Sequence, residues 1–188
     1  MATMDLADLQ PIASDFLESE SRLLQIEVEL QHVERELREQ PKRDKRDEKF
    51  SKLIGLEWKA PSDLMRKRSE LISKKEVLTK LVRETMEKLI EEFSSPEFTM
   101  PLDRQPSRDG EFLVFSYRGG ASYPRAWEAF GNLLGLEVPL MLDPVTIGAD
   151  GIRVKEDDEY LAKEMIVDTI MKLQKTLEMK IEKQPSRR

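Results

Sequence analysis

The feature that most constrains this chain is a row of apolar residues with heptad spacing between positions 16 and 37. Its members are Phe16, Leu23, Ile26, Leu30, Val33 and Leu37. They lie seven, three, four, three and four residues apart, and Ser19 fills the one heptad position that is not apolar. This spacing keeps an apolar stripe on one side of a slightly underwound helix. A lone helix would expose the stripe to water, so the pattern predicts a partner helix.

The first helix should run from Asp5 to Gln40, with an interruption at Pro11 and an end at Pro41. A second long amphipathic segment opens at Pro61 and ends before Pro96. Its stripe supplies further interface candidates, namely Leu71, Leu78 and Val82. The two helices can pair within one chain as an antiparallel hairpin or between chains as a parallel dimer. The connection between them is long enough for either arrangement.

Charge is distributed unevenly along the 188 residues, whose formal net charge is −6. Residues 1–40 hold ten acidic and three basic residues, whereas residues 41–90 hold nine acidic and fifteen basic residues. Neighbouring segments of opposite sign favour pairing of the two helices. The alternative is that the basic segment 42–75 forms a surface for nucleic acid or for an acidic partner.

The remaining chain predicts a small head. Residues 96–110 contain three prolines and a terminal Asp-Gly, which are typical of a linker. A strand is predicted at 111–117. A helix follows it, with Pro124 in its first turn and Gly135 just past its end. Short strands at 138–142 and 145–147 precede an Asp150-Gly151 hairpin signal. The last helix should run from Asp157 or Asp158 to about Lys183, with one apolar stripe that begins at Tyr160 and Leu161.

The predicted fold is therefore mainly α. A coiled-coil or helical-hairpin stalk (1–95) is followed by a linker (96–110) and a small α+β head of order β-α-β-β-α with a long C-terminal helix (111–188). Four apolar side chains should form either the core of the head or its recognition surface, namely Phe112, Val114, Trp127 and Phe130.

Composition limits the chemistry. The chain has no cysteine, which excludes a disulfide framework and thiolate metal sites and fits a reducing compartment. We expect no signal peptide and no membrane-spanning segment, and we place the protein inside the cell, in the cytoplasm or nucleus.

Candidate chemical sites are few. His32 is the single histidine and lies on the heptad helix, where it favours neither a catalytic triad nor a metal site. The Arg118-Gly119-Gly120 turn between a strand and a helix could bind an anion, although it lacks a Walker pattern. The acidic run 156–159 suits a helix N-terminus. We expect no metal and no cofactor.

The sequence thus predicts a non-enzymatic assembly or adaptor protein. It would form homo- or heterodimers through the heptad helices and present the head to protein partners in a larger complex. The alternative is a nucleic-acid-binding accessory factor, whose anion contacts would be Lys42, Arg43, Lys45, Arg46 and Arg118.

Overall fold

The computed structural model describes residues 3–39, 53 and 61–182. It divides into two compact units, which we call the hairpin unit (residues 18–83) and the head unit (residues 1–17 and 84–188). Two long helices, α1 (Leu6–Glu39) and α3 (Pro61–Phe93), contribute residues to both units. The sequence assigned residues 1–95 to a stalk; residues 1–17 and 84–95 of that segment are part of the head unit. Among the described residues, no helix is both long and apolar enough to cross a membrane.

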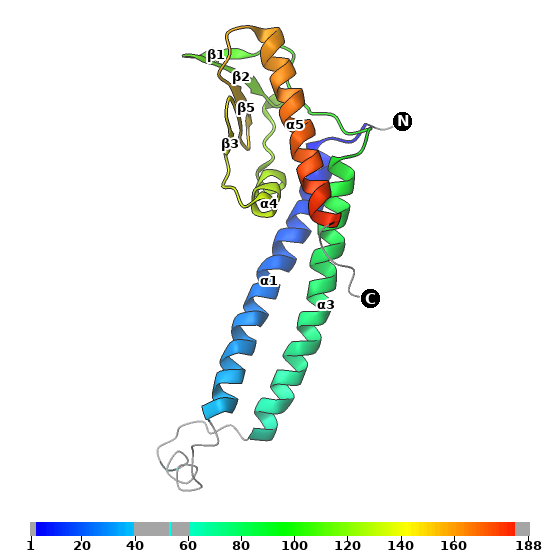
Figure 1. Ribbon diagram of the computed structural model, residues 1–188, viewed down its shortest axis with the longest axis vertical. Coiled ribbons are helices and arrows are strands. Elements are labelled where there is room, and N and C mark those ends of the chain that lie inside the picture. The colour runs from blue at the N-terminus through cyan, green and yellow to red at the C-terminus, as the bar shows by residue number, and fades with distance from the viewer. Residues whose placement is uncertain (1–2, 40–52, 54–60, 183–188) are drawn as a thin grey trace. The chain divides into compact units, whose positions relative to one another are not determined.

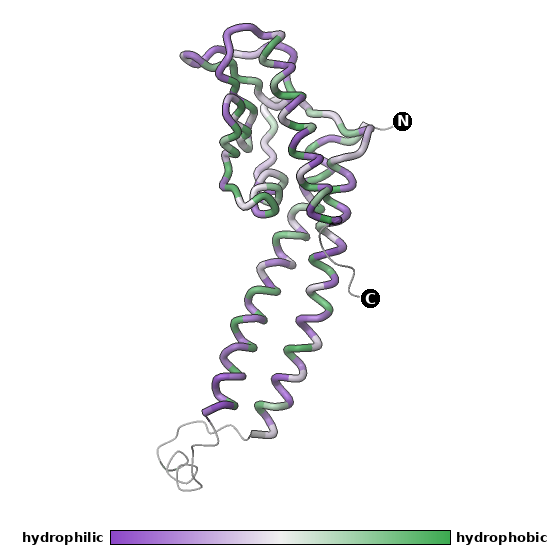
Figure 2. Tube along the Cα trace, viewed as in Figure 1, coloured by the Kyte–Doolittle hydropathy of each residue, from purple (hydrophilic) through white to green (hydrophobic). Residues whose placement is uncertain are grey.

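The hairpin unit is built from α1 and α3, which pack together within one chain. Val33 on α1 is buried with Leu64 and Leu71 on α3. The partly buried Ile26, Leu30 and Leu37 pack against this cluster. Apolar and polar residues alternate along both helices (Figure 2). The structure therefore gives the hairpin form of the two alternatives that the sequence left open.

Two ion pairs fix the direction of the hairpin. Lys75 Nζ lies 2.9 Å from Glu27 Oε1, and Arg68 Nε lies 3.3 Å from Glu34 Oε1. Moving seven residues forward on α1 corresponds to moving seven residues back on α3, so the helices are antiparallel. These pairs join the acidic α1 to the hairpin part of α3 (residues 61–83), which holds seven basic and three acidic residues. They are partly exposed, so each contributes about 0–1 kcal/mol to stability.

The interruption expected at Pro11 does not occur, because α1 continues unbroken from Leu6 to Glu39 with Pro11 inside it. Pro11 lies on the exposed side of the helix and near its start. Its missing N–H deprives one carbonyl, that of Ala7, of a helical partner, and Ala7 is exposed to water. The helix begins instead at a reciprocal cap: the N–H of Ala7 donates to Asp5 (2.7 Å) and that of Asp5 donates to Asp8 (3.0 Å).

The head unit contains one five-stranded antiparallel sheet of order β1-β2-β5-β4-β3. Its strands are β1 (Ser107–Asp109), β2 (Phe112–Ser116), β3 (Leu140–Leu142), β4 (Val145–Ile147) and β5 (Gly151–Val154). Alternate residues are buried, among them Phe115, Ile147 and Ile152, while their neighbours face outward. One face of the sheet is therefore part of the core.

Three helical segments complete the head unit: η2 (Arg118–Gly120), α4 (Pro124–Leu134) and α5 (Glu159–Glu182). Pro124 opens α4 and Gly135 ends it in the left-handed conformation, as the sequence predicted. The buried side of α5 packs on β4 and β5 (Figure 1). An aromatic cluster lies beside α4, where the ring of Phe93 is 4.4 Å from that of Phe130 and 6.3 Å from that of Trp127.

The head has the predicted α+β composition but not the predicted order β-α-β-β-α. Two strands precede α4 and three follow it. The additional strand β1 lies in the segment 96–110, which the sequence assigned to a linker. Its three residues are polar or charged, and all of them are exposed, so the sequence contains no apolar pattern that would predict a strand there. Pairing with β2 holds them as a strand.

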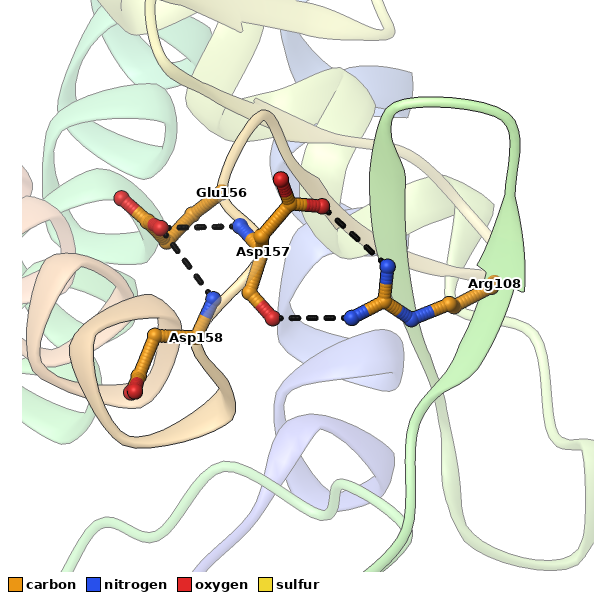
Figure 3. A network of polar contacts seen from close by, with 4 residues as sticks. All are labelled: Arg108, Glu156, Asp157 and Asp158. Atoms are coloured by element: carbon orange, nitrogen blue, oxygen red, sulfur yellow. Dashed lines mark hydrogen bonds and ion pairs between the residues drawn. The ribbon is translucent and has the colours of Figure 1, made fainter.

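The start of α5 is tied to β1 (Figure 3). Arg108 donates to Asp157 Oδ1 (3.1 Å) and to the Asp157 carbonyl (3.0 Å). Glu156 Oε1 accepts the N–H groups of Asp157 (2.8 Å) and Asp158 (3.1 Å). Asp158 then caps the helix by accepting the N–H of Leu161 (3.0 Å). The acidic run is thus used to begin the helix and to anchor the edge strand.

Candidate protein-interaction surface

One flank of α5 carries exposed apolar side chains. Tyr160 is 70% exposed, Val167 57% and Met171 61%. Their spacing of seven and four residues places them on one side of the helix. The buried side of α5 is formed by other residues, among them Ile166, Ile170 and Leu173. We define the α5 face as Tyr160, Glu164, Val167, Met171, Lys175 and Glu178, which share this exposed side by helical spacing.

A groove of about 430 Å³ runs beside the α5 face. One wall is α5, including Val167 and Met171, and the other is the segment 98–102. Phe98, Met100 and Leu102 make that second wall apolar. We call this feature the α5 groove.

The wall opposite α5 is held in place by backbone bonds. Thr99 N–H donates to the Met4 carbonyl (2.8 Å), and Met4 N–H donates to the Glu97 carbonyl (3.2 Å). Leu102 forms a bridge with Tyr117, and the N–H of Asp103 donates to the Ser116 carbonyl (2.9 Å). The groove is therefore built on the scaffold of the head unit.

The two long polar side chains that line the groove already have partners. Gln174 Nε2 donates to the Phe93 carbonyl at the end of α3 (2.6 Å). Lys163 Nζ contacts Glu159 Oε1 (2.5 Å) and the Arg104 carbonyl (3.4 Å). Because these groups are satisfied, an apolar ligand could cover the groove without leaving them unpaired.

A second groove of about 470 Å³ lies beside other residues of α5. Its lining includes Leu136 and Leu142 but also Asp143, Asp168 and Lys172. It is more polar than the α5 groove and therefore a weaker candidate for apolar contact.

Another exposed apolar group is formed by Leu136, Val138 and Met141, at and near the edge strand β3. This edge is three residues long and lies between Pro139 and Pro144. Short length and flanking prolines are features that disfavour pairing of an edge strand with another chain. The α5 face thus remains the stronger candidate.

The heptad residues predicted from sequence lie in several environments. Val33 and Leu71 are buried together, with Ile26, Leu30 and Leu37 packed on them, while Leu23, Leu78 and Val82 are half-buried. Phe16 is buried and belongs to the head unit. Ser19, the polar position of the pattern, is 6% exposed. The apolar side chains at the heptad positions are thus buried or half-buried within the single chain.

The four head residues separate into two pairs. Trp127 and Phe130 lie in the aromatic cluster of the core and are not at the surface. Phe112 and Val114 are half-buried on the outward face of the sheet. The guanidinium of Arg153 lies 5.6 Å from the centre of the Phe112 ring and pairs with Asp109. The Phe112 ring is thus already covered in part by a side chain of its own sheet.

The predicted anion contacts are only partly visible. Lys42, Arg43, Lys45 and Arg46 lie outside the described residues. Arg118 is exposed, but its N–H donates to the Pro101 carbonyl (2.7 Å) and that of Gly120 donates to the Tyr117 carbonyl (3.1 Å). These two N–H groups are thus not directed at a ligand.

Several cations of α3 are also paired with carboxylates. Arg68 and Lys75 contact α1, and Arg66 lies within 4.0 Å of Asp63 and of Glu70. Such pairing reduces the positive charge available to a phosphate backbone.

The remaining polar candidates have structural explanations. The His32 ring is 70% exposed and lies 3.6 Å from Glu36 on the same helix. In the part of the chain that the structure describes, no group of three or more His, Asp or Glu side chains could hold a metal ion.

Tyr117 is a buried titratable group of the head core. Its hydroxyl donates to the Gly148 carbonyl (3.1 Å), and burial raises its pKa far above the ordinary tyrosine value. The indole N–H of Trp127 makes no well-formed hydrogen bond, but its proximity offsets part of this shift in pKa. The group is closed in by protein and behaves as a core contact.

The chain matches no protein-family model, and comparisons with curated proteins and with solved structures give no match either. The surface of the protein itself is therefore the guide to its function.

The α5 face was not predicted from the sequence. Tyr160 was assigned to the single apolar stripe of the last helix, and Val167 and Met171 were given no role. The available signal was a second apolar row at positions 160, 167 and 171, offset from the buried row. Because the helix is apolar on two sides, its pattern did not distinguish the core side from the exposed side.

Proposed function

We propose that this chain is a non-enzymatic assembly or adaptor protein that recognises a protein partner through the α5 face of its head unit. The observation that carries the proposal is the combination of three exposed apolar side chains, Tyr160, Val167 and Met171, with an adjoining apolar groove. Exposed apolar side chains beside an apolar groove are characteristic of protein-binding sites.

The hairpin supports this choice of surface. An assembly protein with an open heptad stripe would pair with other chains through that stripe. Here Val33, Leu64 and Leu71 are already buried against each other. The coiled-coil dimer expected from sequence therefore has less apolar surface to use, and the head becomes the better candidate for recognition.

The non-enzymatic part of the proposal rests on the sequence. The chain has no cysteine and therefore no thiol nucleophile, and its single histidine, the commonest general acid or base, lies exposed on a charged helix.

Site-specific photo-crosslinking tests the proposal. A photoreactive phenylalanine derivative is placed at Met171, or at the exposed Gln105 of the same unit as the control, in cells that produce the chain. We expect a discrete protein adduct from position 171 that disappears when Val167→Asp is added, and none from position 105. Absence of an adduct at position 171, or equal adducts at both positions, would contradict the proposal.

A further inference from the structure

We infer that the α5 face binds a second copy of this chain, with the two α5 helices antiparallel across a twofold axis. This inference rests on the proposed function and names the partner class of the same surface. The two subunits of such a dimer use the same patch, so the patch must be complementary to itself.

The apolar centre of the face meets this requirement. An antiparallel arrangement can place Val167 opposite the partner subunit's Met171, and the symmetry then places Met171 opposite the partner subunit's Val167. Both side chains are more than half exposed. Contact between the copies would remove all four side chains from water, which is the main favourable term in association.

The same register brings opposite charges together on either side of the centre. Glu164 lies three residues before Val167, and Lys175 lies four residues after Met171. Glu164 would therefore lie beside the partner subunit's Lys175, and symmetry would repeat this pair at the other end. Each of the two side chains is exposed and makes no ion pair with another described residue. Complementary charges of this kind fix the register of an interface.

The ends of the face also correspond. Tyr160 is seven residues before Val167, and Glu178 is seven residues after Met171. The Tyr160 hydroxyl would reach the partner subunit's Glu178, whose carboxylate can accept its hydrogen bond. The α5 face is thus complementary to a second α5 face that runs in the opposite direction.

The α5 groove would enlarge the contact beyond one helix pair. Met171 and Val167 line its edge, and Phe98, Met100 and Leu102 form its apolar wall. Unbranched methionine side chains adapt to irregular surfaces, so side chains of the second copy can fill the groove without a pre-shaped pocket. Because a helix pair with one adjoining groove is still a small interface, we expect a dimer with a dissociation constant of roughly micromolar order.

Charge reversal in the intact chain tests this inference, with dimer formation followed by analytical ultracentrifugation over a range of concentrations. Glu164→Lys alone and Lys175→Glu alone should each raise the dissociation constant about tenfold or more, because each places like charges together twice. The double variant should recover the affinity of the unaltered chain. Lys172→Glu, whose side chain lines the other groove, is the control and should leave dimerisation unchanged.

The outcomes separate this inference from the proposed function. A reciprocal loss and recovery in the charge series would support the α5 dimer. A chain that stays monomeric to about a hundredfold above the expected micromolar range, or a double variant that does not recover, would overturn it. If the Met171 photo-adduct then contains a different protein, the proposed function stands and only the identity of the partner is wrong. If the chain stays monomeric and no adduct forms at all, both proposals are wrong.

Discussion

At the scale of single residues, two glutamines connect parts of the head unit that are distant in sequence. Gln10 on α1 accepts the N–H of Ala126 in the first turn of α4 (2.7 Å), and Gln174 on α5 donates to the Phe93 carbonyl at the end of α3 (2.6 Å). Helix ends leave backbone groups without intrahelical partners. These side chains satisfy two such groups and fix the ends of α4 and α3 against their neighbours.

Gly151 is a single residue on which the sheet register depends. A Cβ atom at this position would lie 2.5 Å from the Phe115 carbonyl oxygen and 3.1 Å from Ser116 Cα. We predict that Gly151→Ala lowers the free energy of unfolding by about 1–3 kcal/mol, because β2 and β5 must separate to admit the methyl group. Urea unfolding of the full chain measures the change.

Gly148 is the matched control in the same hairpin. Its Cβ would lie 3.5 Å from the Gly151 carbonyl oxygen, which is an ordinary contact. Gly148→Ala should change the free energy of unfolding by less than about 1 kcal/mol. Equal losses for the two variants would show that the close approach of β2 and β5 is not what requires glycine.

Local sequence signals predicted α4 well at this scale. Pro124 and Gly135 act through their own backbone preferences, so their effect is visible without knowledge of the fold. The cap supplied by Gln10 could not be predicted in this way, because it depends on a contact across 116 positions of the chain.

At the scale of elements, α1 should tolerate apolar truncation on one side and not on the other. Val33 is 2% exposed against Leu64 and Leu71, whereas Val28 on the same helix is 66% exposed. We predict that Val33→Ala lowers the local stability of the hairpin by about 1–3 kcal/mol through lost burial. Hydrogen exchange of the α1 amides measures this local stability.

Val28→Ala is the control, since it makes the same chemical change on the exposed side. It should leave exchange unchanged or slow it slightly, because alanine is the better helix former by roughly 0.5 kcal/mol. If both variants accelerated exchange equally, the buried cluster could not be what holds the two helices together.

The helices were more predictable than the strands. Heptad spacing and proline positions located α1 and α3, because these signals are local and repeated over many residues. β1 was missed because Ser107, Arg108 and Asp109 contain no apolar residue, and its order comes from β2 and from the contact of Arg108 with Asp157. The candidate site was missed for a related reason: only the fold shows which of the two apolar sides of α5 faces the core.

At the scale of the whole molecule, the decisive property is the number of chains needed to bury the apolar heptad stripe. The same row from Phe16 to Leu37 can be buried by a second chain or by α3 of its own chain. The acidic α1 and the basic hairpin part of α3 favour the second arrangement, and the pairs Glu27–Lys75 and Glu34–Arg68 realise it. This closure within one chain is what directs attention to the α5 face for assembly.

Closure of α1 on α3 within one chain is tested most directly by a cysteine pair, which is practical because the chain has no native cysteine. Glu34→Cys and Arg68→Cys replace two side chains that are in contact. Treated with a short bis-maleimide reagent, which spans the gap left by the two long side chains, the double variant should become crosslinked within single chains, and an equimolar mixture of the two single variants should form no covalent heterodimer. Covalent heterodimers in that mixture would show that the heptad helices pair between chains and would contradict the closed hairpin.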